Sequence, residues 1–492
     1  MTLRCLFVDF NSYFASVEQE DDVDLRGRPV AVAPVMTDST CCIAASIEAK
    51  QFGIRTGTLV REARDRCPEL VVVPARPARY LQAHTQLMAA IADCIPHGTP
   101  GSIDEVPCWL IGRERQRDNA IAIARSIKRR IADEFAAIRC SIGIAPNQFL
   151  AKTASDMQKP DGLVVLEQHD LPHALHALEL RDLCGIGASM EARLLAAGID
   201  SVEELCAAPK DRLRAAWGSV DGERFWMQLR GIEVPDRKTQ RGSIGHSHVL
   251  DPKLRTLEGM RAVLFKLLAK AAMRLRHEDG GYLARGLQLH VRFVGLDDRF
   301  SPSVEFAPID DTPSLLHQLA KMLAPLERAA ASGRWNARRN PPLSVAATLV
   351  GIELRSARSG ELIAATRRRK SVTAVLDKVN RHFGNNALFV ASMKTAIDHD
   401  AAPMRIPFSH LPDAALEEDV QTKAHAHAEE LVRLRERQFK VLAETAHKQA
   451  QTHKQGQAKP QAPATSSPSG ATPRIRVPVR AAPPSPQLGL GF

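Results

Sequence analysis

The first 165 residues alternate short apolar runs with stretches in which apolar positions recur at helical spacing. Residues 3–10 form an apolar run that ends in an aspartate, and residues 30–35, 41–46 and 140–144 are further runs of strand length. Residues 12–20, 80–95 and 120–135 repeat apolar positions every three to four residues, which predicts helices. Residues 101–110 place a turn-like segment between apolar flanks, which allows a hairpin. Such mixing predicts an α/β or α+β domain.

The middle of the chain divides into a helical stretch, a linker and a further mixed domain. Residues 166–232 are mostly of helical pattern, with a breaker at Gly185-Ile186-Gly187. Residues 233–243 are polar and basic, which is typical of a linker. Residues 244–400 then combine helices over 257–276 and about 313–329 with strands over 287–293 and 343–354. The first of these strands alternates strictly, so one face of its sheet is expected to be apolar and the other polar.

The C-terminal part has a different composition. Residues 411–450 are charged and of helical pattern, whereas residues 451–492 contain eight prolines, five lysines or arginines and no acid. That composition predicts disorder. The last six residues, from Gln487 to Phe492, are apolar again. An apolar end on a polar tether is typical of a docking peptide.

Composition narrows the class of protein. A length of 492 residues allows about three domains. Lysine and arginine total 66 against 56 acids, and the net charge of +10 favours a polyanionic partner such as nucleic acid. No apolar run approaches the roughly 18 residues of a membrane helix, and the start resembles a strand more than a signal peptide. Nine cysteines without a C-x-x-C pair give no zinc or redox motif. We therefore expect a cytoplasmic protein without a membrane partner.

Three carboxylates stand where strand ends are expected. Asp9 ends the first apolar run, and Asp104 and Glu105 lie in a short turn between apolar flanks. An antiparallel sheet would bring these positions together. Clustered carboxylates repel one another unless a cation is present, and hard oxygen ligands suit Mg²⁺. Surface acids at strand ends are the common alternative, so spacing alone leaves both interpretations open.

The residues around these carboxylates resemble the motifs of Y-family translesion DNA polymerases of bacteria, both DinB-like and UmuC-like. The resemblance rests on Val8-Asp9-Phe10-Asn11-Ser12-Tyr13-Phe14-Ala15-Ser16-Val17-Glu18, on Ser102-Ile103-Asp104-Glu105, and on the segment from Ser141 to Gly162. These motifs occur in family order at family spacing, and the resemblance covers about residues 3–355.

The resemblance implies an α+β multidomain fold of the right-hand polymerase type. It implies a palm with small fingers over residues 1–165 (fingers about 16–75), a helical thumb with a helix-hairpin-helix over 166–232, and an α/β little finger with its extension over 244–400. It also implies low-fidelity, template-directed synthesis on primer-template DNA from deoxynucleoside triphosphates. Two Mg²⁺ ions would be held by Asp9, Asp104, Glu105 and the carbonyl of Phe10, and positioning and charge neutralisation would do most of the work.

The resemblance also assigns binding residues. Phe14 matches the steric gate that excludes a ribose 2′-hydroxyl, Tyr13 belongs to the same nucleotide site, and Lys50 and Lys159 match positions that contact the triphosphate. Gly185 and Gly187 match a helix-hairpin-helix that binds the DNA backbone. The C-terminal Gln487, Leu488, Leu490 and Phe492 resemble the peptide that docks bacterial polymerases on the sliding β-clamp.

The fingers depart from the DinB-like pattern and leave alternatives open. Ala44, Ile47 and Lys50 stand where DinB-like members carry Thr, Tyr and Arg, and this stretch is closer to UmuC-like members. A lysine still offers phosphate a point charge, but it lacks the guanidinium fork. The alternatives to an active polymerase are an inactive family member that serves as an adaptor to other mutagenesis proteins, and a DNA-binding clamp-tether protein without chemistry.

Overall fold

A computed structural model describes residues 2–235, 241–277, 280–355, 364–404, 406, 408, 411–412 and 417–419. By its contacts the chain divides into a compact unit over Met1–Ala426 and a second unit over His427–Phe492. All statements below concern the described part of the first unit. The expected tail with its terminal peptide, and most of the charged stretch 411–450, lie outside the described residues.

The first sheet has the strand order β5-β1-β6-β7. It consists of β1 (Cys5–Phe10), β5 (Glu105–Trp109), β6 (Cys140–Ala145) and β7 (Leu163–Val165). β1 pairs antiparallel with both β5 and β6, and Asp9 stands opposite Glu105 in the register. The antiparallel sheet expected to join the acidic positions is therefore confirmed. The turn at residues 101–104 closes the expected hairpin, because residues 97–101 pair back antiparallel with β5 through the His97–Cys108 bridge and the hydrogen bond from the amide of Gly101 to the carbonyl oxygen of Glu105.

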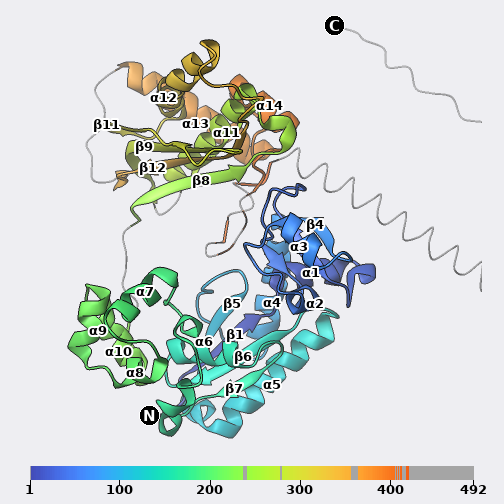
Figure 1. Cartoon of the computed structure of the whole chain (residues 1–492), viewed down its shortest axis with the longest axis vertical. Coiled ribbons are helices and arrows are strands. Elements are labelled where there is room, and N and C mark those ends of the chain that lie inside the picture. Colours follow the sequence, from blue (N-terminus) through green and yellow to red (C-terminus); the bar gives the residue numbers. More distant parts are fainter. Residues whose placement is uncertain are drawn as a thin grey trace, which may run out of the picture. The chain divides into compact units, whose positions relative to one another are not determined.

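Helices cover both faces of this sheet, because successive side chains of β1 point to opposite sides. Leu6, Val8 and Phe10 pack with α4 (Pro77–Ala92) and α5 (Arg117–Glu134), whereas Cys5 and Phe7 pack with α6 (Gln148–Met157). Figure 1 shows the strands between α6 and α5. Gly143 of β6 lets α6 approach closely, since a Cβ atom there would stand 1.9 Å from the carbonyl oxygen of Ala151. This close packing brings the side chains of α6 to the end of the sheet where the acids lie.

A small three-stranded sheet of order β3-β2-β4 follows α1 (Tyr13–Asp21) in the chain. It comprises β2 (Val30–Ala33), β3 (Ala44–Ala45) and β4 (Val71–Pro74), with α2 (Ile47–Gln51) and α3 (Val60–Arg66). The helical stretch that comes later contains α7 (Ala188–Ala196), α8 (Val202–Ala207), α9 (Lys210–Trp217) and α10 (Asp221–Gln228). The expected helical character is confirmed for residues 188–228, whereas residues 166–187 contain only short 3-10 turns.

A six-stranded sheet forms the next domain, with β10-β9-β12-β8 in order and β11 and β13 also paired to β9. Its strands are β8 (Ser243–Val249), β9 (Tyr282–Phe293), β10 (Arg299–Phe300), β11 (Ser303–Ile309), β12 (Pro342–Val350) and β13 (Glu353–Leu354). The predicted alternation in β9 is confirmed, because Leu287, Leu289, Val291 and Phe293 are all buried.

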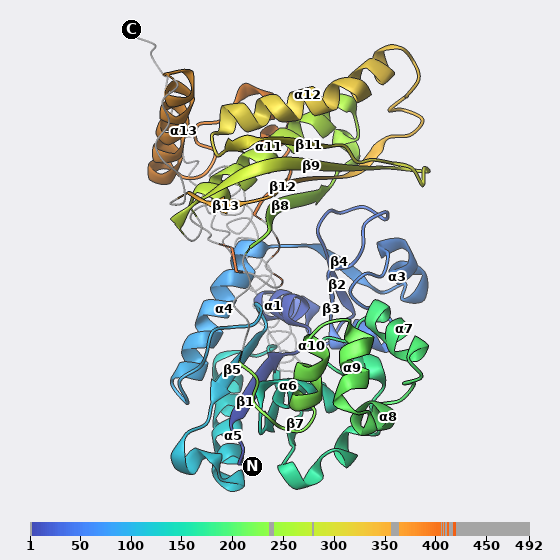
Figure 2. The same cartoon turned by 90° about the vertical axis from the view of Figure 1, so that its left-hand side faces the viewer.

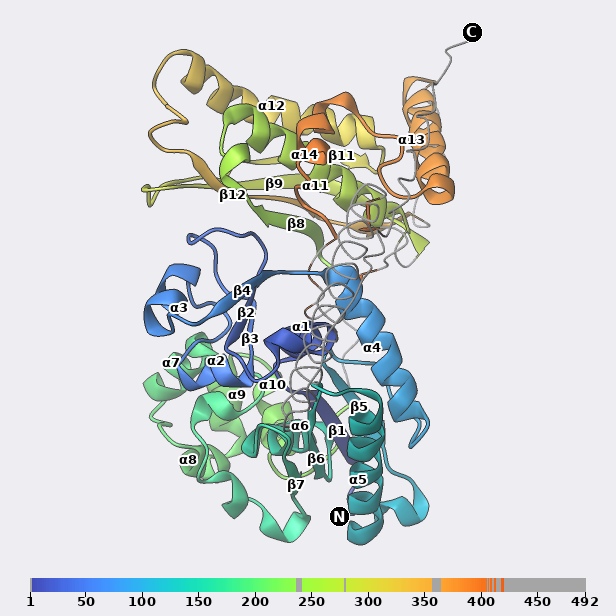
Figure 3. The same cartoon turned by 90° about the vertical axis from the view of Figure 1, so that its right-hand side faces the viewer.

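Helices α11 (Leu257–His277) and α12 (Thr312–Ala331) cover one face of this sheet, as Figures 2 and 3 show. Helices α13 (Ala364–Phe383) and α14 (Lys394–Asp398) follow in the chain. The apolar side chains of α11 join those of β9 and β12 in one core. Three basic side chains of α11, however, are buried as well: Lys266, Lys270 and Arg274 are 1%, 3% and 7% exposed.

Candidate active site

The predicted catalytic and nucleotide-binding residues line one cavity of about 770 Å³. A volume of this size is within the range of about 300–1,000 Å³ that is usual for ligand pockets. β1 and α1 supply one wall, the turn before β5 a second, the α2 region a third, and the loop after α6 a fourth. The residues predicted from sequence that line it are Asp9, Phe10, Tyr13, Phe14, Lys50, Asp104, Glu105 and Lys159.

Backbone pairing places the three carboxylates together. The amide of Phe10 donates to the carbonyl oxygen of Asp104 at 2.8 Å, which extends the β1–β5 ladder by one step beyond Glu105. Ser102 Oγ donates to Asp104 Oδ1 at 2.5 Å and fixes that side chain in the turn. The register of two strands and a turn therefore places the three acidic residues at the same end of the sheet.

Two lysines neutralise the acidic cluster. Lys159 Nζ donates to Asp9 Oδ1 at 2.6 Å and lies 2.7 Å from Asp156 Oδ1, while Lys152 of α6 makes an ion pair with Glu105. Burial raises the pKa of Asp9 to about 6, against the opposing effect of Lys159 and with a further increase from the charge of Asp104. Burial would lower the pKa of Lys159, but Asp9 and Asp156 outweigh it and raise that pKa. The site thus holds anions that require a nearby cation.

In this arrangement the ammonium groups of Lys152 and Lys159 supply the positive charge beside the acids. Among the residues that the structure describes, no three His, Cys, Asp or Glu side chains converge closely enough to form a metal site. The chemistry of the donors nevertheless fits a divalent cation, because Asp9 is a buried carboxylate whose charge is costly and Asp104 raises its pKa further. Carboxylate and carbonyl oxygens are the ligands that Mg²⁺ prefers.

A network that the sequence did not reveal holds the loop of Lys159. Asn11 Oδ1 accepts a hydrogen bond from the amide of Asp161 at 2.7 Å, and Asn11 Nδ2 donates to Ser141 Oγ at 3.0 Å. Lys128 Nζ donates to Asp161 Oδ1 at 2.5 Å. Asn11 and Ser141 belong to the motifs that carry the resemblance, but only the fold shows that they join β1, β6 and this loop.

Lys50 lies on the opposite wall, on α2. Its pKa is lowered by partial burial and by the positive charge of Lys159. Its ammonium makes no hydrogen bond or ion pair with any other residue of the described ranges, in contrast to Lys152 and Lys159. A cation without a protein carboxylate partner in the described ranges is suited to bind an anionic ligand, to which an ammonium group offers a point charge. Ala44 and Ile47 line the same wall and offer no polar side chain.

The ring of Phe14 is held between other aromatic rings. It stacks on Tyr80 of α4 with centroids 4.4 Å apart and planes at 18°, and Tyr13 OH donates to the carbonyl oxygen of Tyr80 at 2.7 Å. Tyr80 is fully buried, and Phe14 is only 4% exposed. Sequence analysis did not single out Tyr80. The rarity of tyrosine, which occurs only three times in the chain, was the one sequence feature that could have drawn attention to Tyr80.

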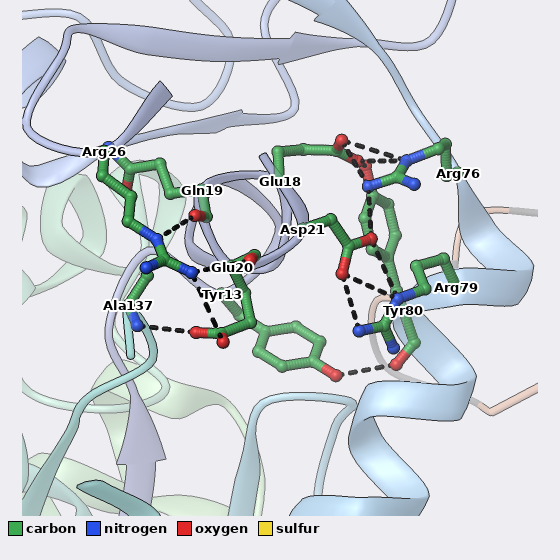
Figure 4. Close-up of polar contacts among 10 residues, drawn as sticks. All are labelled: Tyr13, Glu18, Gln19, Glu20, Asp21, Arg26, Arg76, Arg79, Tyr80 and Ala137. Carbon is green, nitrogen blue, oxygen red and sulfur yellow. Dashed lines mark hydrogen bonds and ion pairs between the residues drawn. The ribbon is translucent and has the colours of Figure 1, made fainter. Parts of the chain in front are cut away.

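An ion-pair network fixes Tyr80 in turn, as Figure 4 shows. Tyr80 OH donates to Glu18 Oε1 at 2.8 Å, and Arg76 Nη2 lies 2.7 Å from both Glu18 Oε2 and Asp21 Oδ2. Arg79 Nη2 also pairs with Asp21, at 2.8 Å. Burial would raise the pKa of Asp21, but hydrogen bonds and charge from Arg79 and Arg76 lower it. α1 and α4 are therefore joined rigidly behind the Phe14 ring.

The other predicted binding residues lie elsewhere. Gly185 adopts φ +93°, a conformation that favours glycine, and Gly187 is the N-cap of α7. The structure thus places both glycines in a turn before a helix, apart from the cavity. Gln487, Leu488, Leu490 and Phe492 lie outside the described residues. No helix of the described ranges is both long and apolar enough to cross a membrane.

Comparison with known proteins identifies similar chains. Residues 8–156 match the impB/mucB/samB family, and residues 241–362 match the C-terminal domain of that family. DNA polymerase IV of Moorella thermoacetica is 39% identical over 293 residues, which are 58% of this chain and 72% of that protein. DNA polymerase IV of Pelotomaculum thermopropionicum is 30% identical over 400 residues, which are 79% of this chain and 95% of that protein.

A solved structure shares the fold. It is a Y-family DNA polymerase chimera of Dbh and Dpo4, with a TM-score of 0.58 at 22% identity. The alignment covers 72% of this chain and 100% of the chimera. The mixed α/β architecture expected from the motifs is confirmed by this neighbour. Because the relatives are named DNA polymerase IV, the comparisons also favour the DinB-like over the UmuC-like side of the resemblance.

Proposed function

This chain belongs to the Y family of DNA polymerases and is DinB-like, and from this premise we propose that Asp9, Asp104 and Glu105 are its catalytic carboxylates. The chain is a template-directed DNA polymerase of the translesion class. The observation that carries the assignment is the β1–β5 register, which sets Asp9 opposite Glu105 at the wall of the cavity. No observation favours an inactive adaptor or a tether without chemistry.

We propose that the same carboxylates, with the carbonyl of Phe10, hold two Mg²⁺ ions. When bound, the two ions neutralise the charge that develops on the transferring phosphoryl group. The protein's own contribution is to hold the acids at one wall of the cavity, where Phe10 and Ser102 fix Asp104 by hydrogen bonds to its carbonyl and carboxylate oxygens. Lys152 and Lys159, which now pair with the acids, are then available to balance the charge of the triphosphate.

The nucleotide is proposed to enter between α2 and α1. Lys50 and Lys159 bind its phosphates, and the Phe14 ring lies against the sugar and excludes a 2′-hydroxyl. Tyr13 lines the same cavity and links α1 to α4 through its bond to Tyr80. Support for the gate is the rigid backing of Phe14 by Tyr80, because steric exclusion requires a ring that does not yield.

Primer-template DNA and the sliding β-clamp are the proposed macromolecular partners. The turn at Gly185 and Gly187 would bring backbone amides to a DNA phosphate at the N-terminus of α7. The terminal peptide Gln487, Leu488, Leu490 and Phe492 would dock on the clamp, tethered by the residues before it. We further propose the domain plan expected from the motifs: palm and fingers to 165, thumb to 232, and little finger to about 400. The proposed setting of this synthesis is the bacterial cytoplasm.

Primer extension with Mg²⁺ tests the catalytic assignment. Asp104→Asn and Glu105→Gln remove one charge each without changing shape. We expect extension to fall by about a hundredfold or more, because charge stabilisation in the transition state is worth several kcal/mol. Asp93→Asn and Glu62→Gln are matched controls, since both acids are exposed and lie apart from the cavity. Activity within about threefold of the parent in either test variant would overturn the assignment.

A further inference from the structure

A segment after α14 is anchored in the core of the last domain. Ala401, Ala402 and Met404 are each 4% exposed. Lys266 Nζ of α11 donates to the carbonyl oxygen of Ala401 at 2.6 Å, and Lys270 Nζ donates to that of Ala402 at 2.8 Å. The buried lysines of α11 are thus satisfied by the backbone of this segment.

α11 also contacts the chain further on, at Glu417 and Asp419. Lys266 Nζ lies 2.6 Å from Asp419 Oδ2, and Arg274 Nε lies 3.7 Å from Glu417 Oε1. Asn385 Nδ2 also donates to Asp419 Oδ1, at 3.0 Å. Glu417 and Asp419 are buried, at 2% and 4% exposure. α11 therefore contacts this part of the chain at Ala401 and Ala402 and again at Glu417 and Asp419.

Between the two anchors the segment reaches the proposed nucleotide pocket. The carbonyl oxygen of Phe408 accepts a hydrogen bond from the amide of Ile103 at 3.2 Å, directly before the catalytic Asp104. The Phe408 ring lies 5.7 Å from the Phe14 ring, tilted by 53°. Ile406 packs against the core that contains Phe14 and Tyr80.

Phe408 is part of the wall of the cavity and does not fill it. The cavity keeps its volume of about 770 Å³ with Phe408 among its lining residues. Phe408 is 47% exposed, so about half of its surface is open to a ligand. Phe14 contacts both the Tyr80 ring and the Phe408 ring and is itself only 4% exposed.

We propose that Phe408 is a specificity-determining residue of the nucleotide pocket. The Phe14 ring contacts both Tyr80 and Phe408, and in this proposal the contact with Phe408 holds the gate ring on Tyr80 and in the path of a 2′-hydroxyl. The inference rests on the proposed role of Phe14 as the gate. The C-terminal segment thereby takes part in the choice of sugar, although it lies beyond the residues that match the family.

The test compares the efficiency of ribonucleotide and deoxynucleotide insertion by the full chain. Phe408→Ala is expected to raise the ratio of ribo- to deoxynucleotide kcat/KM roughly two- to tenfold, which is the value of one aromatic contact. Phe408→Tyr keeps a ring and should keep the parental ratio. Phe383→Ala is the matched control, because Phe383 is a phenylalanine of α13 that is 66% exposed and lines no part of the cavity.

Two results would overturn the inference. An unchanged ratio in Phe408→Ala would show that the ring does not support the gate. A fall in KM for both nucleotides with an unchanged ratio would show that Phe408 obstructs the pocket instead. Phe14→Ala, measured in parallel, separates this inference from the proposed function. If Phe14→Ala raises the ratio and Phe408→Ala does not, only the role of Phe408 fails; if Phe14→Ala leaves the ratio unchanged, the gate itself is wrong.

Discussion

Acidification should weaken the attachment of the C-terminal segment through one partly buried histidine. His248 Nε2 of β8 accepts a hydrogen bond from the amide of Ala402 at 3.2 Å, so its ring is neutral in the folded chain. Burial lowers the pKa of His248 to about 4, helped by the positive charges of Lys266 and Lys270 and opposed by Asp251. Protonation of His248 would break its hydrogen bond with the amide of Ala402 and would add a third positive charge beside Lys266 and Lys270.

The pKa values fix the direction and size of the effect. The unfolded chain has a histidine pKa of 6.5, above the folded value of about 4, so between these values the unfolded state binds more protons. The contribution of His248 to stability is therefore fully present above about pH 6.5 and is lost as the pH falls toward 4. Lowering the pH from about 7.5 to about 5 should remove about 2 kcal/mol through this group alone.

Urea unfolding at the two pH values, followed by hydrogen exchange in peptides from β8 and α11, measures this loss locally. A local probe is needed because a multidomain chain seldom unfolds in one step. In His248→Gln the side-chain oxygen accepts from Ala402 without titrating, so about 2 kcal/mol of the pH-dependent loss should disappear. His382→Gln, at an exposed position of α13, is the control. The reasoning fails if His248→Gln loses as much stability on acidification as the parent.

Three further outcomes are expected, two from the site and one from the C-terminal peptide. Phe14→Ala should raise ribonucleotide insertion while deoxynucleotide insertion persists; an unchanged ratio in competition assays would make the ring a plain core residue. Tyr80→Phe keeps the stack but leaves Glu18 without one donor, so it should cost about 1–3 kcal/mol in urea unfolding and leave sugar choice near the parental value; a large change in sugar choice would contradict this division of roles. Deleting residues 487–492 should spare extension of short naked primers and abolish stimulation by loaded clamp, and equal stimulation of both proteins would rule out the terminal tether.

Local patterns predicted the parts of the site that depend on strands and turns. The apolar run before Asp9 and the turn before Glu105 indicated two strand ends, and an antiparallel sheet brings such ends together. The alternation in residues 287–293 likewise identified the buried face of β9. These features are encoded by neighbouring residues, because side-chain direction in a strand has a period of two.

Contacts between distant segments were not predictable in the same way. The pair between Lys152 and Glu105 requires α6 to lie close against β6, which only the fit of Gly143 under α6 permits. Tyr80 backs Phe14 across 66 positions of sequence, and neither residue carries a pattern that refers to the other. Side-chain type and spacing describe a helix face, but they do not say which element covers it.

The buried basic residues of α11 nevertheless allow one long-range prediction, namely that polar groups must cover their face of the helix. Lys266, Lys270 and Arg274 recur every four residues on a helix that is otherwise mostly apolar, so they share one face. A buried ammonium or guanidinium without partners costs several kcal/mol, and this face must therefore be covered by acids or carbonyl oxygens. The match to the C-terminal domain of the family ends at residue 362, whereas the covering groups come from residues 401–419. The last domain is consequently incomplete without this segment, and the segment that completes it is also the one that carries Phe408 to the active site.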